Sequence, residues 1–189
     1  MDTNCFGTWN LLKKYPDSRI IFASSSSVNK PQSIYAFTKK WGEDIGAFHK
    51  NWVNVRFYNV FGENQPEDSG ALVPHLIMSK IRGEQPTIFG NGEQMRDFTY
   101  VGDIVEWLNE IAFRRISGLV HLGYAFPCSV NDMGRMVFGQ DYNPHYYPKR
   151  SFDIEHNEAP SSDFPPVYGR REGMQKTIEW YENTYTRNS

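Results

Sequence analysis

Apolar and polar positions alternate along the chain in blocks that predict strands joined by helices. The run "RIIFAS" at 19–24 is short, apolar and bounded by polar residues, which is typical of a strand buried on both faces. The segment "VNVRFYNVFG" at 53–62 reads as a second strand, and between them the pattern after Pro31 predicts a helix from about Ser33 to Lys50. Two strands joined by a helix form a βαβ unit, so we expect a parallel sheet.

Further elements are expected on both sides of this unit. The segment 3–15 has a helical pattern, and four apolar residues can share one face of it: Phe6, Trp9, Leu11 and Leu12. A helix is expected at 71–83, with Pro74 in its first turn and Gly83 as its stop. The segment 85–101 predicts a short strand, an Asn-Gly turn and a second extended piece.

The rest of the chain alternates in the same way. Asp103 is expected to cap a helix that runs to about Arg115, and Ser129 to cap a helix over 130–138. A buried strand is expected at 118–124 and a closing helix at 171–184, whereas 140–169 is rich in Pro, Tyr and polar residues and is expected to be mostly irregular.

Composition excludes several classes of protein. The 189 residues carry a net charge of -2, which gives no reason to expect nucleic acid or an anionic membrane as partner. No apolar run approaches the roughly 20 residues of a membrane span. The five histidines and two cysteines lack the spacing of metal ligands, so no metal site is expected, and a reducing cytoplasmic location fits best.

The stretch "FASSSSVNKPQSIYAFTKK" at 22–40 holds the candidate chemistry. Tyr35 and Lys39 lie four residues apart and share one face of the expected helix. A nearby ammonium lowers the pKa of a phenol, and a tyrosine tuned in this way can act as a general base. Taken alone, a tyrosine and a lysine at this spacing can also occur by chance on a helix surface and have no catalytic role. A serine at the carboxyl end of a parallel strand changes that balance, because open α/β sheets bind their ligands there.

These motifs occur in an order that resembles a known family. Strand-Ser-Ser, then Tyr-x-x-x-Lys, then "RFYNVFG" and "GNGEQMRDFTYVGDIV" are similar to the extended short-chain dehydrogenase/reductases, and most of all to NAD-dependent nucleotide-sugar 4-epimerases of the UDP-glucose and UDP-glucuronate type. The resemblance implies an α/β fold: the C-terminal part of a Rossmann-type parallel sheet plus a small α+β substrate-binding domain. It places the partial Rossmann domain at 1–62 and 94–124, and the substrate domain at 63–93 and 125–189.

The resemblance also implies roles for individual residues. Ser25, with Ser26 as the alternative, matches the catalytic serine. Tyr35 matches the base and acid, Lys39 the lysine that holds the nicotinamide ribose, and Asn4 an asparagine near the active site. Substrate contacts are implied for three further residues: Asn59, Arg96 for the diphosphate, and Arg150 as a second phosphate ligand.

Each of these residues has a simpler structural interpretation. Asn4 could cap a helix, Asn59 could serve a turn at a strand end, and Arg96 could form a surface ion pair with Asp97. Arg150 lies where the sequence fits the family poorly and could be a solvated charge.

The family's mechanism follows from the same resemblance. Tyr35 would take the proton of a sugar hydroxyl while NAD oxidises its carbon, Ser25 would hydrogen-bond the reacting oxygen, and the resulting 4-keto sugar would be reduced on its other face. The related 4,6-dehydratases carry an acidic residue just after the catalytic Ser/Thr. Here Ser26, Ser27 and Val28 follow, which favours an epimerase over a dehydratase; a nucleotide-sugar dehydratase or reductase remains the alternative enzyme.

The sequence departs from the family pattern in one large respect. The glycine-rich strand-turn-helix that holds the pyrophosphate of NAD does not occur, and the "GNG" at 90–92 is a turn. We therefore expect the remaining sheet to have an open apolar edge, covered by a complementary N-terminal-half polypeptide or by another copy of the chain. The rival hypotheses are a non-catalytic nucleotide-sugar-binding module and a self-associating structural remnant.

Overall fold

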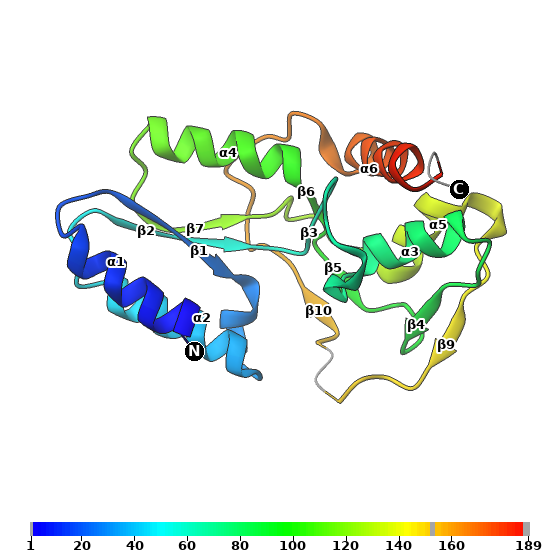
Figure 1. Cartoon of the computed structure of the whole chain (residues 1–189), viewed down its shortest axis with the longest axis horizontal. Coiled ribbons are helices and arrows are strands. Elements are labelled where there is room, and N and C mark those ends of the chain that lie inside the picture. The colour runs from blue at the N-terminus through cyan, green and yellow to red at the C-terminus, as the bar shows by residue number, and fades with distance from the viewer. Residues whose placement is uncertain (1, 152–153, 187–189) are drawn as a thin grey trace.

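The computed structural model describes residues 2–151 and 154–186. Its centre is a three-stranded parallel sheet with the order β1-β2-β7 (Figure 1), built from β1 (Ile20–Ser25), β2 (Trp52–Phe57) and β7 (Gly118–Leu122). Both the parallel pairing and the joining helix agree with the βαβ unit expected from the sequence. The chain therefore has the α/β fold that the pattern predicts.

Helices cover both faces of this sheet. A π-helix (Asp2–Gly7), α1 (Thr8–Lys14) and α2 (Ile34–Gly46) lie on one side, and α4 (Val101–Phe113) lies on the other (Figure 1). Beneath α4, apolar strand residues such as Val55 and Val120 pack against Trp107 and Ile111. α2 ends at Gly46, four residues before the expected end, because tight turns after Ala47 lead into β2.

α2 approaches the sheet very closely through two glycines. A Cβ added at Gly42 would lie 2.2 Å from the ring of Phe22, and one added at Gly46 would lie 2.0 Å from the ring of Trp52. Since no real Cβ contact is that short, both rings occupy space that only a glycine leaves open. The spacing between helix and sheet is therefore set by these two positions.

The rest of the chain forms a second compact part. Its core lies among α3 (Leu72–Ile81), α5 (Val130–Phe138) and α6 (Gly169–Tyr185), and includes Leu76 and Met133. Short strands connect this part to the sheet: β3 (Val60–Phe61) with β6 (Thr99–Tyr100), β4 (Thr87–Phe89) with β9 (His145–Tyr147), and β5 (Met95–Arg96) between β8 (Cys128–Ser129) and β10 (His156–Asn157). Three short 3-10 helices complete the described elements: Ser26–Asn29, Glu67–Ser69 and Gly139–Asp141.

Several local expectations are confirmed. Pro74 lies in the first turn of α3, and Gly83, with φ +67°, follows its end. Ser129 caps α5 in a capping box with Asp132. Except for the short elements just named, the segment 140–169 is irregular within its described residues.

The expected cap at Asp103 is wrong, for a non-local reason. Asp103 does not cap its own helix; its carboxylate accepts hydrogen bonds from the backbone N–H groups of Val167, Tyr168 and Gly169, where α6 begins. The segment 85–101 does contain the expected strand, turn and second extended piece, as β4, the Asn-Gly turn and β5, but these strands pair elsewhere, β4 with β9 and β5 with β8 and β10.

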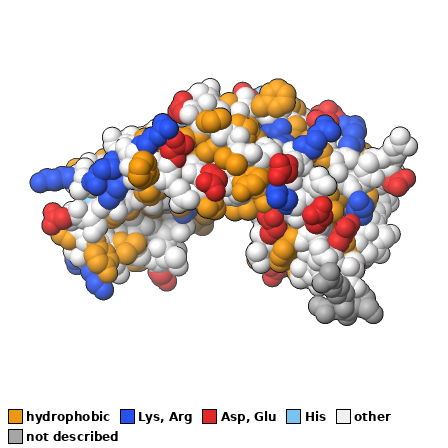
Figure 2. All heavy atoms as spheres, turned by 90° about the horizontal axis from the view of Figure 1, so that it is seen from above, with side chains coloured by type: hydrophobic (Ala, Val, Ile, Leu, Met, Phe, Trp, Pro, Cys, Tyr) orange, Lys and Arg blue, Asp and Glu red, His pale blue; other side chains and the backbone are white. Residues whose placement is uncertain are grey.

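The apolar residues of the first helical segment do not form a buried face. Phe6, Trp9 and Leu11 are exposed, because among the described residues nothing packs over that side of α1. β1 is likewise less buried than expected for a central strand: it lies at the end of the sheet, and Ala23 is exposed. Seen from above, the molecule is hollowed along one side between its two parts (Figure 2). None of the helices in the described residues is long and apolar enough to cross a bilayer.

Candidate active site

Ser25 is the last residue of β1 and begins the turn that follows the strand. Its Oγ accepts hydrogen bonds from the backbone N–H of Ser27, at 3.2 Å, and from the Ser27 hydroxyl, at 2.9 Å. Both lone pairs of Ser25 Oγ are thereby engaged, so its own proton remains available to donate. Ser26 is buried, and its Oγ accepts a hydrogen bond from Asn157 at 2.9 Å. Ser25 is thus the better placed of the two to meet a ligand.

Tyr35 and Lys39 lie on one side of α2, as their spacing predicts. Ser33 begins the helix, where its Oγ accepts from the N–H of Ala36. The Tyr35 side chain is half exposed, and Lys39 Nζ lies 5.7 Å from the centre of its ring. Nζ also donates to the carbonyl of Ala23 in β1, at 2.9 Å, and burial lowers the pKa of Lys39 below its ordinary value. The phenol, the ammonium and Ser25 therefore gather at the carboxyl end of β1.

Asn4 contacts the turn of α2 that carries Tyr35. Its Nδ2 donates to Thr38 Oγ1 at 3.0 Å, and that hydroxyl donates to the carbonyl of Tyr35 at 2.8 Å. The alternative role for Asn4, capping a helix, is not found, because α1 begins at Thr8 with Gly7 as its N-cap residue and no side-chain cap. Asn4 lies in a π-helical turn, a geometry that is rare in proteins overall but is often found at functional sites.

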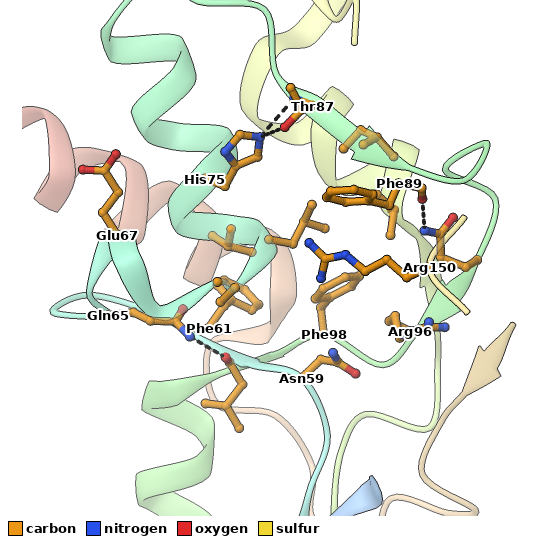
Figure 3. A pocket seen from close by; sticks show the side chains of 18 residues that line it. Asn59, Phe61, Gln65, Glu67, His75, Thr87, Phe89, Arg96, Phe98 and Arg150 are labelled. Carbon is orange, nitrogen blue, oxygen red and sulfur yellow. Dashed lines mark hydrogen bonds between the residues drawn. The ribbon is translucent and has the colours of Figure 1, made fainter. Parts of the chain in front are cut away.

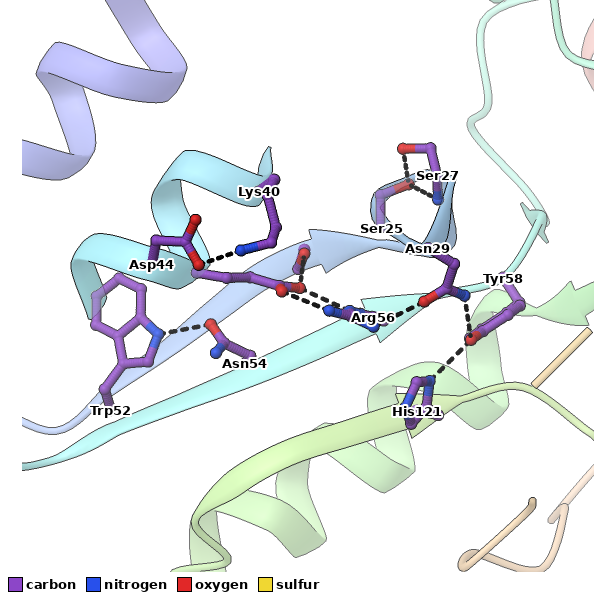
Figure 4. A network of polar contacts seen from close by, with 12 residues as sticks. Ser25, Ser27, Asn29, Lys40, Asp44, Trp52, Asn54, Arg56, Tyr58 and His121 are labelled. Carbon is purple, nitrogen blue, oxygen red and sulfur yellow. Dashed lines mark hydrogen bonds and ion pairs between the residues drawn. The ribbon is translucent and has the colours of Figure 1, made fainter. Parts of the chain in front are cut away.

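A polar network runs beneath these groups from α2 to β7 (Figure 4). Glu43 accepts from Ser24 at 2.5 Å and from two nitrogens of Arg56 at 2.7 and 2.6 Å. Arg56 also donates to Asn29 at 2.7 Å, which places the turn after the serine run. The buried side of α2 is in this way fixed to two strands by charge-assisted hydrogen bonds.

The network continues from Asn29 toward the third strand. Asn29 donates to the hydroxyl of Tyr58, at 3.2 Å, so Tyr58 can donate to His121 Nδ1, at 2.8 Å. Burial raises the pKa of Tyr58, and burial together with the charge of Arg56 lowers the pKa of His121. Sequence analysis missed this network, although a charged Arg56 inside a buried strand was a visible signal for it.

A cavity of about 690 Å³ lies beside the carboxyl ends of the strands, in the second part of the molecule (Figure 3). Three of the predicted substrate residues line it: Asn59, Arg96 and Arg150. Asn59 interrupts the expected strand between β2 and β3 with φ +34°, a conformation that asparagine tolerates better than most residues. Asn59 is therefore both a turn residue and a lining residue.

Arg150 points into this cavity. Its guanidinium carbon lies 3.9 Å from the centre of the Phe89 ring, and in Figure 3 the side chain runs between Phe89 and Phe98. Arg96 donates to the carbonyl of Met95 at 2.7 Å. Its pairing with Asp97 as a surface ion pair is not found, since Asp97 is fully buried and pairs with Arg170 at 3.4 Å.

Sequence analysis also missed several of the residues that line the cavity. The aromatic ring of Phe89 and the imidazole of His75, which hydrogen-bonds the backbone N–H of Thr87, are among them. A cavity with two arginines and an aromatic ring is suited to a ligand that has both anionic groups and a flat ring. Within the described residues, no group of three or more His, Cys, Asp or Glu side chains could hold a metal ion.

One side chain joins the cavity to the serine run. Asn157 of β10 lies opposite Arg96 of β5 in the parallel pair, and its amide reaches Ser26 next to Ser25. Ser25, Tyr35 and Lys39 are not among the residues that line the cavity. The predicted proton-transfer residues thus lie next to the predicted substrate residues but do not line the same cavity.

Comparison with known proteins gives this arrangement a family. The model of the NAD dependent epimerase/dehydratase family matches residues 1–114. A putative UDP-glucose 4-epimerase from Methanocaldococcus jannaschii is 27% identical over 217 residues, covering 96% of this chain and 70% of the relative. UDP-glucuronic acid decarboxylase 1 from Xenopus tropicalis is 25% identical over 223 residues, covering 96% of this chain and 51% of the relative.

Solved structures agree with these sequence matches. The structure of MoeE5 in complex with UDP-glucose and NAD is 28% identical, with a TM-score of 0.84, over 96% of this chain and 71% of that one. The chain thus spans between about half and about 70% of the length of the proteins it matches.

Proposed function

Because the chain belongs to the NAD dependent epimerase/dehydratase family, we propose that it is part of an NAD-dependent nucleotide-sugar 4-epimerase and carries both the proton-transfer groups and the nucleotide-sugar site. One observation carries the proposal: Ser25, Tyr35 and Lys39 gather at the carboxyl end of β1, beside a cavity with two arginines. That is where open α/β sheets bind ligands.

Each residue has a physical role in the proposed reaction. Tyr35 removes the proton of the sugar 4-hydroxyl and later returns a proton to the 4-keto oxygen, a task for which its half-exposed phenol is accessible. Ser25 donates its free proton to the same oxygen and so fixes its position. NAD, when bound, supplies the oxidation and reduction of the sugar carbon.

Arginine side chains hold the other end of the substrate. Arg96 and Arg150 would bind the diphosphate, whose oxygens match the fork of a guanidinium, and Phe89 would lie against the base. Asn59, between the sheet and the cavity, would contact the sugar. This division assigns proton transfer, Asn59 and Arg96 to 1–62 and 94–124, and Phe89 and Arg150 to 63–93 and 125–189.

The chain's residues fit one end of the cofactor only. Lys39 and Tyr35 have hydrogen-bonding groups beside an open strand end, as the ribose hydroxyls of NAD require. No glycine-rich turn for a pyrophosphate occurs in the 189 residues. We therefore propose that a complementary NAD-binding segment acts together with this chain and covers the open edge of β1.

Coexpression tests this proposal. The chain is expressed together with the part of the Methanocaldococcus jannaschii relative that it does not match, and the complex is assayed for interconversion of UDP-glucose and UDP-galactose. We expect activity that Tyr35→Phe abolishes and that Tyr15→Phe, at an exposed tyrosine outside the site, leaves intact. An NAD-loaded complex that binds UDP-glucose without epimerising it would overturn the epimerase assignment.

A second candidate function rests on the cavity itself. This chain supplies the two arginines and the aromatic ring of the cavity, which a nucleotide-sugar-binding module without redox chemistry would use. Calorimetry with UDP-glucose on the chain alone separates the candidates when read with the coexpression assay. Binding without any activity in the complex favours the module. Decarboxylation or dehydration of the sugar in place of epimerisation would instead favour an activity like that of the UDP-glucuronic acid decarboxylase relative or of a dehydratase.

A further inference from the structure

The open edge of the sheet presents a defined set of backbone groups. Residues along a strand direct their N–H and C=O groups alternately to the two sides. Ile20 N–H donates to Asn51, so Ile20, Phe22 and Ser24 face β2. The backbone groups of Ile21, Ala23 and Ser25 therefore face away from β2, on the side where the described structure places no strand.

Lys39 hydrogen-bonds to one of these outward-facing backbone groups. Its Nζ donates to the Ala23 carbonyl at 2.9 Å, and Nζ lies 5.4 Å from the centre of the Phe22 ring, so the side chain lies along the edge of β1. Burial lowers the pKa of the amine, which agrees with its partial removal from water. The lysine proposed for the reaction is thus held by a backbone acceptor of the sheet.

A neighbouring strand would need the same acceptor. Adjacent strands lie about 4.8 Å apart, and their N–H groups donate to the carbonyls that face them. The Lys39 ammonium, 2.9 Å from the Ala23 oxygen, already holds this acceptor. A strand that pairs with β1 would therefore compete with Lys39 for the Ala23 carbonyl.

We propose that Lys39 blocks the open edge of β1 through its hydrogen bond to Ala23, and that a parallel strand of the complementary segment releases it toward Tyr35 by pairing there. The inference rests on the proposed function for the identity of that segment. After release, Nζ is free to turn toward the phenol, whose ring centre is already 5.7 Å away. The strand that completes the sheet would thus also free Lys39 for its role beside Tyr35.

The occupant is a strand of the complementary segment for two reasons. This chain leaves about 30% of the Methanocaldococcus jannaschii relative unmatched, because the alignment covers 70% of that relative. A second copy related by a two-fold axis would pair β1 with β1 in antiparallel fashion, whereas every pair in this sheet is parallel. Pairing of the chain with itself is an outcome that the test detects.

The test uses binding of the separately expressed part of the Methanocaldococcus jannaschii relative that this chain does not match. Lys39→Met removes the blocking hydrogen bond, and we expect it to tighten binding about five-fold, since one such bond must no longer be broken. Lys40→Met is the matched control: Lys40 pairs with Asp44 on the exposed side of α2, and the variant should bind as the unaltered chain does.

Two variants at Ala23 locate the contact. Ala23→Pro removes the outward N–H without touching the bonds to β2 and should abolish binding, whereas Ala23→Ser keeps the donor and should bind normally. In the complex, hydrogen exchange at Ile21, Ala23 and Ser25 should slow by at least about 100-fold.

The outcomes distinguish the two proposals. Tighter binding by Lys39→Met with protection of the β1 amides supports the inference even where the complex of the unaltered chain has no epimerase activity, which overturns the proposed function alone. Equal or weaker binding by Lys39→Met overturns the inference. So does a complex with unprotected β1 amides, a failure of every variant to bind, or protection that arises from dimerisation of the chain.

Discussion

The two parts of the molecule differ in how completely they bury their apolar residues. Around α3, α5 and α6, side chains such as Leu76, Ile77 and Met133 are fully buried in one core. On the α2 side of the sheet, Phe6 and Phe37 are each 61% exposed and Ile34 is 75% exposed. Exposed apolar surface of this extent marks an interaction surface. The part around the cavity closes its core, whereas the sheet part leaves apolar side chains exposed beside the groups proposed for proton transfer.

Removing the carboxylate that joins the two parts should have the largest effect. Asp97 is fully buried and accepts from the N–H groups of Tyr124, Ala125 and Ala159 as well as from Arg170. Asp97→Ala leaves these donors and a buried charge without a partner and should cost about 4 kcal/mol of unfolding free energy. Urea denaturation measures it. Asp141→Ala, on an exposed 3-10 helix, is the control, and an equal loss in both variants would contradict the role of Asp97.

Breaking the ion pair of the sheet part should have the next largest effect. Burial alone would raise the pKa of Glu43, but hydrogen bonds from Arg56 and Ser24 lower it below its ordinary 4.5. Glu43→Gln should cost about 3 kcal/mol at neutral pH. A carboxylate whose pKa is lowered in the folded state adds stability at pH values above its ordinary pKa. The difference in unfolding free energy between the unaltered protein and Glu43→Gln should therefore shrink as the pH falls below about 4.5.

Urea denaturation between pH 7 and pH 3 checks this prediction. Asp44→Asn, at the exposed partner of Lys40, is the control and should change stability little at any pH. A Glu43→Gln deficit that stays constant over the whole range would show that the charge of Glu43 does not contribute.

Ligand binding should separate the two parts more finely. If the cavity holds the nucleotide, Arg150→Gln should weaken UDP binding about ten-fold by removing a charged donor, whereas Tyr35→Phe should leave it unchanged. Calorimetry with UDP measures both. Arg135→Gln, at an exposed arginine of α5, is the matched control, and an equal loss there would point to unspecific attraction of the phosphate charge.

The smallest predicted effect compares one helix cap in each part. Ser33→Ala in α2 and Ser129→Ala in α5 should each cost about 1 kcal/mol, because each hydroxyl satisfies a backbone N–H of the first turn. Hydrogen exchange should show the loss locally near Tyr35 in the first variant and near Met133 in the second. A global loss from Ser33→Ala would mean that α2 is better integrated than its exposed surface indicates.

Local chemistry explains which parts of the fold could be predicted. A run of buried-type residues, a serine before a helix and a glycine after one act through neighbouring backbone groups. The sequence therefore sufficed for β1, β7, the cap at Ser129 and the stop at Gly83. The same local rule predicted that Asp103 caps its own helix, but its carboxylate accepts hydrogen bonds at the start of α6, more than 60 residues away. No local pattern encodes such a partner.

The candidate site divides in the same way. The spacing of Tyr35 and Lys39 predicted a shared helix face, and the strand end predicted the place of Ser25. That Asn157 would reach Ser26, or that Arg56 would pair with Glu43, depends on pairings between distant segments. The acceptor of Lys39 depends on an edge of the sheet that only the assembled structure shows.

The two glycines of α2 have a practical consequence. Replacing a helical glycine by alanine commonly stabilises a protein, because the unfolded chain loses freedom. At Gly42 and Gly46 the new methyl group would collide with Phe22 and Trp52 and push the helix outward. The side chains that α2 presents at the strand end would move with it. A routine thermostabilising substitution at either position would thus misalign the groups proposed for proton transfer, and engineers of this fold should leave both glycines untouched.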